Sequence, residues 1–187
     1  GDIHAEKTSD AAIARVAALI KRFKPENIFV HDLLDFSSRN HHNIKDPFFL
    51  HAQYVDGATV DGDLKCASDT LDILANAYKA ATTHVIVSNH DQAADTWLRG
   101  NDWRFDPINA ETYLVLALAK VQATKRGDAA HNSLEYAYRN IAGGKAKNVI
   151  FHSLDESVKV AGVECGSHGH NGCLLYTSDA ADDTPCV

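Results

Sequence analysis

Apolar and polar residues follow one another along the chain in two rhythms, one typical of buried strands and one typical of helices. Short runs rich in β-branched and aromatic residues predict strands at 27–30, 83–88 and 147–152. Apolar residues at helical spacing predict helices at 13–23, 64–78, 106–121 and 133–141. Because these strands and helices alternate, the pattern predicts an α/β fold with a parallel sheet and right-handed crossovers.

Boundary signals support several of these elements. Ser9 or Thr8 is a plausible N-cap of the first helix, and Pro25 stops it. Asp106-Pro107 is expected to open a long helix, with Asp as the N-cap and Pro at the first helical position. Smaller elements are expected as a short helix around 96–99, neighbouring strands at 157–160 and 162–165, and a helix stop at Gly143-Gly144.

Residues 36–62 show no clear periodicity and are predicted to be irregular. The stretch is polar and histidine-bearing, with Gly57 and Gly62 as breakers. Long structureless insertions are usually functional or disordered, so a substrate-facing loop is one interpretation. The alternative is a solvated loop whose histidines have no role.

Composition narrows the classes of protein. A chain of 187 residues with 45% hydrophobic content predicts one globular domain with a full core. No apolar run is long enough to span a membrane, so no membrane partner is expected. The net charge of -7 argues against a generally basic nucleic-acid-binding surface, but it is compatible with a nuclease whose metal ions meet the phosphate. The cysteines indicate neither a disulfide framework nor a zinc motif, whereas 11 histidines favour a transition-metal site.

Chemically versatile side chains stand where the predicted strands end. Asn89-His90-Asp91 follows the strand at 83–88, and His31-Asp32 follows the strand at 27–30. Asp2 and His4 are two residues apart, a spacing that puts both side chains on one face of an extended segment. His168 and His170 stand in a glycine-rich turn after the last predicted strand. Ligands of open α/β sheets bind at the carboxyl ends of strands, so these groups predict one site.

Other candidates have simpler interpretations. His152 is more readily a hydrogen-bonded strand histidine than a ligand, and Cys165 a small packed residue than a nucleophile. The aromatic side chains Trp97, Trp103 and Tyr113 are expected to pack in the core rather than to stack on bases.

These blocks, taken in order, resemble the calcineurin-like metallophosphoesterases. That family has Asp-x-His, then Gly-Asp, then Gly-Asn-His-Asp/Glu, then a lone His, then Gly-His-x-His. Here Gly1-Asp2-Ile3-His4, His31-Asp32, Ser88-Asn89-His90-Asp91 and His168 match the first four blocks over nearly all of residues 1–172. His31 and Ser88 replace usual glycines, and the fifth block is missing. In an alternative alignment His168 and His170 form the final pair.

The resemblance implies a calcineurin-like sandwich of mixed β-sheets flanked by helices, and a hydrolase with two divalent metal ions (Mn, Fe, Zn or Mg). Asp32 would bridge the ions, Asp2 and His4 would hold one, and Asn89 and His168 the other. His90 would protonate the leaving oxygen while Asp91 holds its tautomer. The predicted substrate-binding residues are His31, Asp35, Arg39, His41, His42 and His170.

Within that superfamily, 31–42 and 89–110 are similar to a branch from T5-like phages implicated in degrading host DNA. The favoured function is therefore a phosphodiesterase or nuclease acting on DNA, located in the cytoplasm of the host bacterium if it is phage-encoded. A phosphomonoesterase acting on nucleotides or phosphoproteins and a non-catalytic metal-binding module are the alternatives, because a fold alone does not select among them.

Both ends of the chain depart from the family pattern. We expect 1–172 to form a metallophosphoesterase domain truncated at both ends, with its first strand before Gly1 and its final ligands after Gly172. Residues 173–187 resemble a translated sequencing-library adapter, so they are expected to be a non-native tail.

Overall fold

The computed structural model describes residues 3–40, 44–154 and 156–166. Its helices are α1 Asp10–Phe23, α2 Pro47–Val55, α3 Val60–Ala77, α4 Ala93–Gly100, α5 Ala110–Lys125 and α6 Ser133–Asn140. Its strands are β1 Asn27–His31, β2 Thr82–Ile86, β3 Val149–His152, β4 Lys159–Val160 and β5 Val163–Glu164. Short 3-10 turns are η1 Ser37–Arg39, η2 His90–Gln92, η3 Trp103–Phe105 and η4 Pro107–Asn109.

In the described residues the main sheet has the order β1-β2-β3, and both strand pairs are parallel. The register places Val30 beside Val85, and Val85 beside Phe151. The predicted α/β fold with a parallel sheet is therefore confirmed. Strands β4 and β5 form a separate antiparallel hairpin, in agreement with the neighbouring strands expected there.

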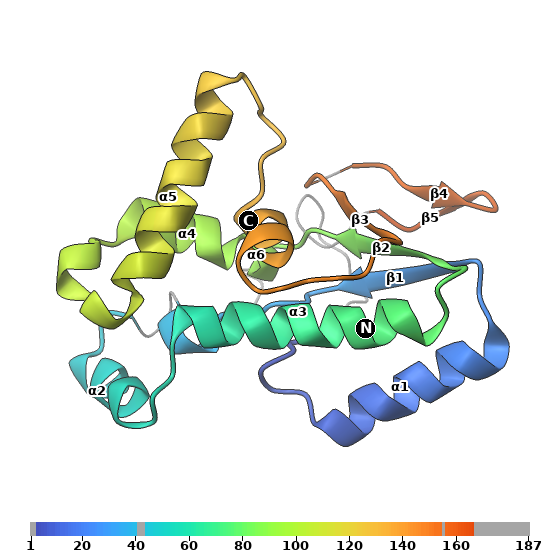
Figure 1. The fold of residues 1–187 in the computed structure, drawn as a ribbon, viewed down its shortest axis with the longest axis horizontal. Helices are drawn as coiled ribbons and strands as arrows, with labels where there is room; N and C mark the ends of the chain where they lie inside the picture. The colour runs from blue at the N-terminus through green and yellow to red at the C-terminus, as the bar shows by residue number, and fades with distance from the viewer. Residues whose placement is uncertain (1–2, 41–43, 155, 167–187) are drawn as a thin grey trace, which may run out of the picture.

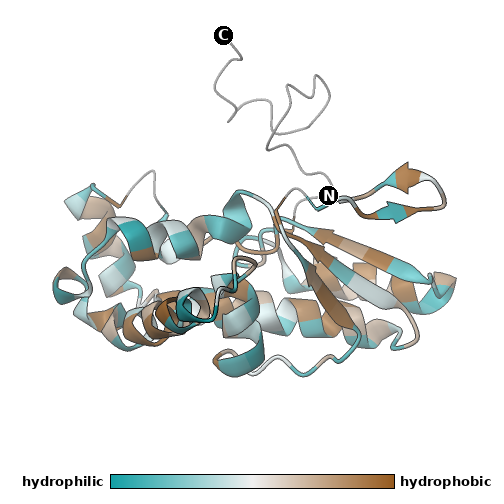
Figure 2. Ribbon diagram, turned by 90° about the horizontal axis from the view of Figure 1, so that it is seen from above, coloured by the Kyte–Doolittle hydropathy of each residue, from teal (hydrophilic) through white to brown (hydrophobic). Residues whose placement is uncertain are grey.

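Helices α1 and α3 lie side by side along one face of the sheet, while α4, α5 and α6 form a second group beyond one end of it (Figure 1). The sheet strands carry much of the strongly apolar colour in Figure 2. Burial agrees with this, because the core residues Leu64, Leu71 and Leu74 of α3 share one cluster with Val30 and Val85 of the sheet. None of the helices in the described part of the chain has both the length and the apolar composition that a membrane span requires.

The first helix is bounded as its sequence predicts. The Ser9 side chain accepts a hydrogen bond from Ala12 N, and Lys24 adopts the left-handed conformation at the C-cap, just before Pro25. Ile13, Ala17 and Ile20 are buried, so the predicted apolar spacing is also the buried face.

The prediction that 36–62 is irregular is wrong. The segment contains η1, all of α2 and the start of α3. Helix α2 begins at Asp46-Pro47, where the Asp46 side chain accepts a hydrogen bond from Phe48 N at 2.9 Å. Most residues of α2 are apolar and none is buried, so the segment lacks the alternation of apolar and polar faces by which helices are recognised in a sequence.

The expected N-cap role of Asp106 is also wrong. Helix α5 begins only at Ala110, after the turn η4, and the Asp106 side chain makes no capping hydrogen bond. Its carboxylate instead accepts hydrogen bonds from the side chains of Arg39 and Asn109. The Asp106 carboxylate therefore binds the buried guanidinium of Arg39, from a distant segment, instead of capping the helix.

Asp72 of α3 joins the helical layer to the segment that leads into β3. Its carboxylate accepts hydrogen bonds from Tyr138 Oη at 2.6 Å, Lys145 N at 2.9 Å and Ala146 N at 3.0 Å. Burial and the hydrogen bond to Asp72 raise the pKa of Tyr138, so its hydroxyl stays protonated and donates. One side chain therefore positions both the end of α6 and the approach to β3.

We predict that Asp72→Ala lowers the free energy of unfolding by about 2–3 kcal/mol, because it leaves a tyrosine hydroxyl and backbone N–H groups without their acceptor. Urea unfolding measures this effect. Asp69→Ala is the matched control, since Asp69 lies on the same helix and only forms an exposed ion pair with Lys65. Equal losses in the two variants would contradict the prediction.

Candidate active site

The segments that follow β1 and β2 meet beside the segment that precedes α1. Ile3 N and His4 N donate to Asp32 O, and Ala5 N donates to Leu33 O, so residues 3–5 lie along the end of β1. From the end of β2, the turn η2 brings His90 to the same place. The site thus lies at the carboxyl ends of parallel strands, as predicted.

His4, Asp35 and His90 form the centre of this site. Their potential metal-ligating atoms all lie within 4.8 Å of one another. His4 Nδ1 is 3.1 Å from Asp35 Oδ1, and the rings of His4 and His90 meet edge to face with centroids 4.8 Å apart. The imidazole of His4 and the carboxylate of Asp35 are donors that suit first-row divalent cations, so this pair fits the kind of metal that the resemblance implies.

Asp35 is held in place as an anion. Its side chain is buried, Lys7 Nζ lies 2.8 Å from Oδ2, and Ser37 Oγ donates to the same oxygen at 2.6 Å. Burial acts to raise the pKa of Asp35, but the hydrogen bonds from Lys7 and Ser37 outweigh it and lower the pKa below its usual value. The carboxylate is therefore ionised at neutral pH, as a metal ligand must be.

Carboxylates from three other segments hold the backbone that carries Asp35. Glu6 accepts from Asp35 N at 3.0 Å and from Phe36 N at 2.9 Å. Asp91 accepts from Leu34 N at 3.0 Å, and Asp63 of α3 accepts from Ser38 N at 2.9 Å. Because this loop is buried, its N–H groups need acceptors within the protein, and these side chains supply them.

The same burial changes the ionisation of these acids. Desolvation raises the pKa of Glu6 to about 7 and that of Asp91 to about 6, although backbone hydrogen bonds oppose it in both cases. It also raises the pKa of Asp63. Each of these groups binds a proton more tightly in the folded protein than in the unfolded chain.

Backbone conformations of high energy concentrate at this site. His4, Asp32 and Phe36 have φ angles of 42°, 45° and 59°, in the left-handed region that L-residues seldom occupy. Such positions cost roughly 1–3 kcal/mol each and tend to gather at functional sites. Phe36 is fully buried in the core, which compensates for this cost by burying its ring.

One predicted role at the strand ends does not agree with the structure. Asp91 was expected to orient His90, but its oxygens accept from Leu34 N and from Ser88 N and Oγ, so it joins the two loops. Asp32 is fully buried and lies outside the three-residue cluster, and its assignment as the bridging ligand stays a prediction. Asp35, predicted to bind substrate, is the carboxylate that the structure places beside His4 and His90.

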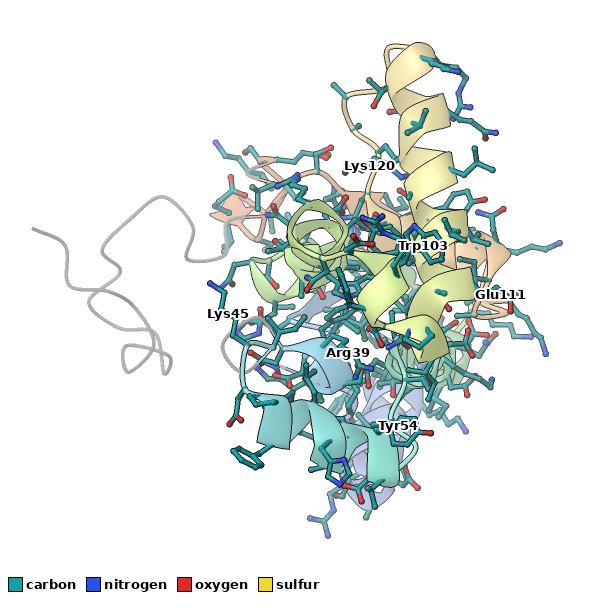
Figure 3. All side chains as sticks on the ribbon, turned by 90° about the vertical axis from the view of Figure 1, so that its left-hand side faces the viewer. Arg39, Lys45, Tyr54, Trp103, Glu111 and Lys120 are labelled. Atoms are coloured by element: carbon teal, nitrogen blue, oxygen red, sulfur yellow. The ribbon has the colours of Figure 1, made fainter. Side chains whose placement is uncertain are left out.

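Arg39, which was predicted to bind substrate, is paired within the protein. Its guanidinium makes two 2.7 Å hydrogen bonds to the Asp106 carboxylate and a third to Ser38 O. Only 5% of the residue is exposed, and Figure 3 labels it between Tyr54 and Trp103 in that view. The charge is therefore used to hold the turn η1 against the segment before α5.

The remaining predicted residues are distributed as follows. Asn89 is exposed at the start of η2, and His31 is half-buried at the end of β1. The other predicted site residues, Asp2, His41, His42, His168 and His170, lie outside the described residues.

Glu6, Lys7 and Asp63 are parts of the site that reasoning from the sequence missed. A signal for Glu6 was present, because it follows His4 by two residues, as His4 follows Asp2. Lys7 and Asp63 carried no comparable signal, since each contributes through a partner distant in sequence.

The simpler interpretations of neighbouring residues are mostly confirmed. Trp97 is buried and meets Tyr113 edge to face at 5.1 Å, which is core packing, whereas Trp103 is 40% exposed. The buried His152 has a partner for each ring nitrogen, His84 at 2.9 Å and Glu156 at 2.8 Å. It is a hydrogen-bonded strand histidine, as expected.

Comparison with known proteins connects the chain to a phage protein. It is 42% identical to Protein A1 of Escherichia phage T5 over 181 residues, which is 92% of this chain and 32% of that protein. The chain thus spans about a third of that relative's length, and the similarity confirms the predicted likeness to a T5-like phage protein. No protein-family model and no solved structure matches the chain.

Because folded Glu6 has a raised pKa, we predict that the free energy of unfolding in metal-free buffer falls as the pH rises from about 4.5 to about 7. The contribution of Glu6 to this fall is about 3 kcal/mol. Glu6→Gln imitates the protonated side chain, so its urea unfolding should depend less on pH over that range. The exposed Glu111→Gln is the control, and an unchanged slope in Glu6→Gln would contradict the assignment.

Proposed function

We propose that the protein is a metal-dependent phosphoester hydrolase, and that its substrate is a phosphodiester of DNA. The observation that carries the proposal is the meeting of His4, Asp35 and His90 where β1 and β2 end. These residues come from three separate segments, and two of them belong to sequence blocks that resemble those of the calcineurin-like metallophosphoesterases. The convergence of metal-binding donors at a strand-end site supports hydrolysis more than a purely structural role.

His4 and Asp35 would hold a divalent cation in this proposal. Lys7 and Ser37 fix the orientation of Asp35, while Glu6 fixes the backbone that bears it. A bound divalent cation supplies a hydroxide nucleophile at neutral pH and neutralises charge on the phosphoryl oxygens. The resemblance adds Asp2, Asp32, Asn89 and His168 as ligands of a dinuclear centre, and those assignments rest on the resemblance alone.

His90 is assigned as the proton donor to the leaving oxygen. It stands on the turn η2 beside His4 and is half-buried, so part of the residue remains accessible to a substrate. An imidazole is the usual side chain for proton transfer near neutral pH.

DNA is proposed as the substrate because of the resemblance to the T5-like phage branch. The net charge of -7 opposes general attraction to a polyanion, so bound cations and local basic groups have to attract the phosphate. The direct test is hydrolysis of bis-para-nitrophenyl phosphate by the complete gene product, compared with the mono-ester.

We expect metal-dependent turnover that a chelator abolishes and that favours the diester. Faster turnover of the mono-ester would support a phosphomonoesterase instead. Absence of any metal-dependent turnover would support a non-catalytic metal-binding module and refute the proposal.

Asp35→Asn is predicted to weaken divalent-metal binding by about tenfold or more, because it removes the anionic donor. Calorimetric titration with Mn²⁺ or Zn²⁺ measures the change. Asp69→Asn, an exposed carboxylate on α3, is the control and should bind metal as the unchanged protein does. Unchanged affinity in Asp35→Asn would exclude Asp35 as a ligand.

For His90→Asn we predict retained metal binding and a rate loss of about 10²–10⁴ for esters with poor leaving groups. Nitrophenyl esters should lose much less, because nitrophenolate needs little protonation. Steady-state rates on both ester types, together with metal titration, separate the roles. A loss of metal affinity in His90→Asn would instead make His90 a ligand.

A further inference from the structure

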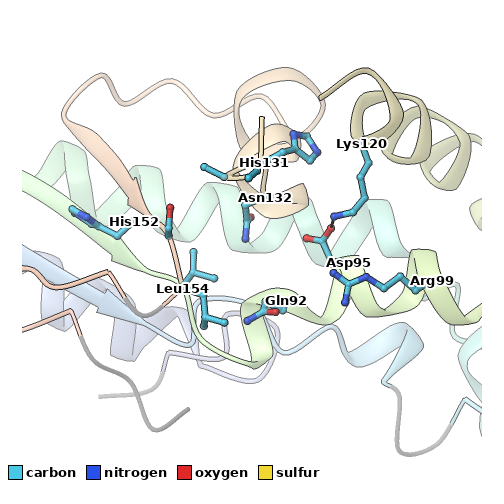
Figure 4. Close-up of a pocket in the computed structure, with 12 residues that line it drawn as sticks. Gln92, Asp95, Arg99, Lys120, His131, Asn132, His152 and Leu154 are labelled. Carbon is cyan, nitrogen blue, oxygen red and sulfur yellow. Dashed lines mark hydrogen bonds and ion pairs between the residues drawn. The ribbon is translucent and has the colours of Figure 1, made fainter. Parts of the chain in front are cut away.

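A hollow opens near the proposed catalytic cluster, on the side of Gln92. It has a volume of about 470 Å³ and lies between the loop after β2, helices α4 and α5, and the segment that leads into α6. Gln92, Arg99, Lys120 and His131 contribute to its lining from these segments (Figure 4). No role has been assigned so far to any of these residues.

The lining is rich in positively charged and basic side chains, although the whole chain is acidic. Its carboxylate, Asp95, already pairs with Lys120 and accepts hydrogen bonds from Ser133 N at 3.1 Å and Ser133 Oγ at 3.0 Å. Within the described part of the chain, no ion pair joins Arg99 to a carboxylate. The guanidinium of Arg99 therefore leaves uncompensated positive charge at this hollow.

Two further groups in the lining lack partners. The Nε2 atoms of Gln92 and His131, two residues of the lining, have no hydrogen-bond partner among the described residues and are themselves closed off from solvent. A glutamine amide nitrogen is a donor, and a histidine Nε2 is a donor in one tautomer. Burying such groups without an acceptor is costly, so a side-chain rotation that brings either nitrogen to an acceptor oxygen of a ligand in the hollow would be favourable.

The hollow is close to the proposed reaction centre. Gln92 follows His90 by two residues on the turn η2, so their Cα atoms are at most about 7 Å apart. A strand whose scissile phosphate lies at His4, Asp35 and His90 would carry another phosphate within reach of Gln92.

We infer that this hollow, lined by Gln92, Arg99 and His131, binds a phosphate group adjacent to the scissile phosphodiester. The inference rests on the proposed function. It also gives the bound DNA strand a defined direction, since one side of the scissile bond is held between α4 and α5. Arg99 supplies the positive charge, and Gln92 and His131 supply hydrogen bonds. Guanidinium, amide and imidazole N–H groups all donate hydrogen bonds to phosphate oxygens. Lys120 is not part of the recognition, because Asp95 already neutralises it.

The test is binding without catalysis. The purified protein is titrated in a chelator, at low and moderate salt, with a thymidine dinucleotide that contains one internal phosphodiester and with thymidine 5′-monophosphate. Arg99→Gln and His131→Ala should each weaken dinucleotide binding, the former by about tenfold, since a charge-assisted hydrogen bond is lost. Arg15→Gln, an exposed arginine of α1, is the control.

The outcomes separate the sources of the phosphate. Weakened binding of the dinucleotide supports a neighbouring phosphodiester in the hollow, whereas weakened binding of the monophosphate alone assigns the hollow to a terminal phosphate and overturns the inference. The inference is overturned if Arg99→Gln and His131→Ala each bind both probes as tightly as the Arg15→Gln control does. Metal-dependent hydrolysis that persists in that case leaves the proposed function intact. Arg99-dependent binding in a protein without any turnover contradicts the proposed function alone.

Discussion

The buried loop after β1 is the constraint on which the rest of the structure depends. Leu33, Leu34 and Phe36 place the loop inside the core, where water cannot satisfy its backbone N–H groups. Glu6, Asp63 and Asp91 accept hydrogen bonds from those groups and tie the loop to the N-terminal segment, to α3 and to the loop after β2. Because several elements meet at one loop, its position is determined by the whole fold rather than by its own sequence.

This arrangement connects stability to the proposed chemistry. The carboxylates that hold the loop have raised pKa values, because burial disfavours their charged forms. Asp35 differs from them, since Lys7 and Ser37 keep its pKa low and its charge available. The site therefore contains acids that position the backbone and one acid, Asp35, that keeps its negative charge, and their environments distinguish the two kinds.

The helices beyond the carboxyl end of the sheet extend the site in one direction. Helices α4 and α5 bring Arg99 and Lys120 next to η2, and Asp95 neutralises one of them. Arg39, by contrast, is paired with Asp106 and stabilises the connection to α5. Among these three cations Arg99 alone has no ion pair within the described residues, so it is the one whose charge is available to a substrate.

The sequence by itself determined the order of strands and helices, the ends of α1 and the strand-end positions of His4, His90 and their neighbours. These features depend on local periodicity, capping and β-propensity, which neighbouring residues specify. It did not reveal α2, whose apolar residues are spread around the helix instead of gathered on one buried face. Tertiary structure alone decided that Asp35 joins the histidines, that Asp91 and Glu6 hold a loop, and that Arg39 is structural. Each of those roles depends on a partner far along the chain, and no local pattern specifies which distant group a buried charge or N–H will meet.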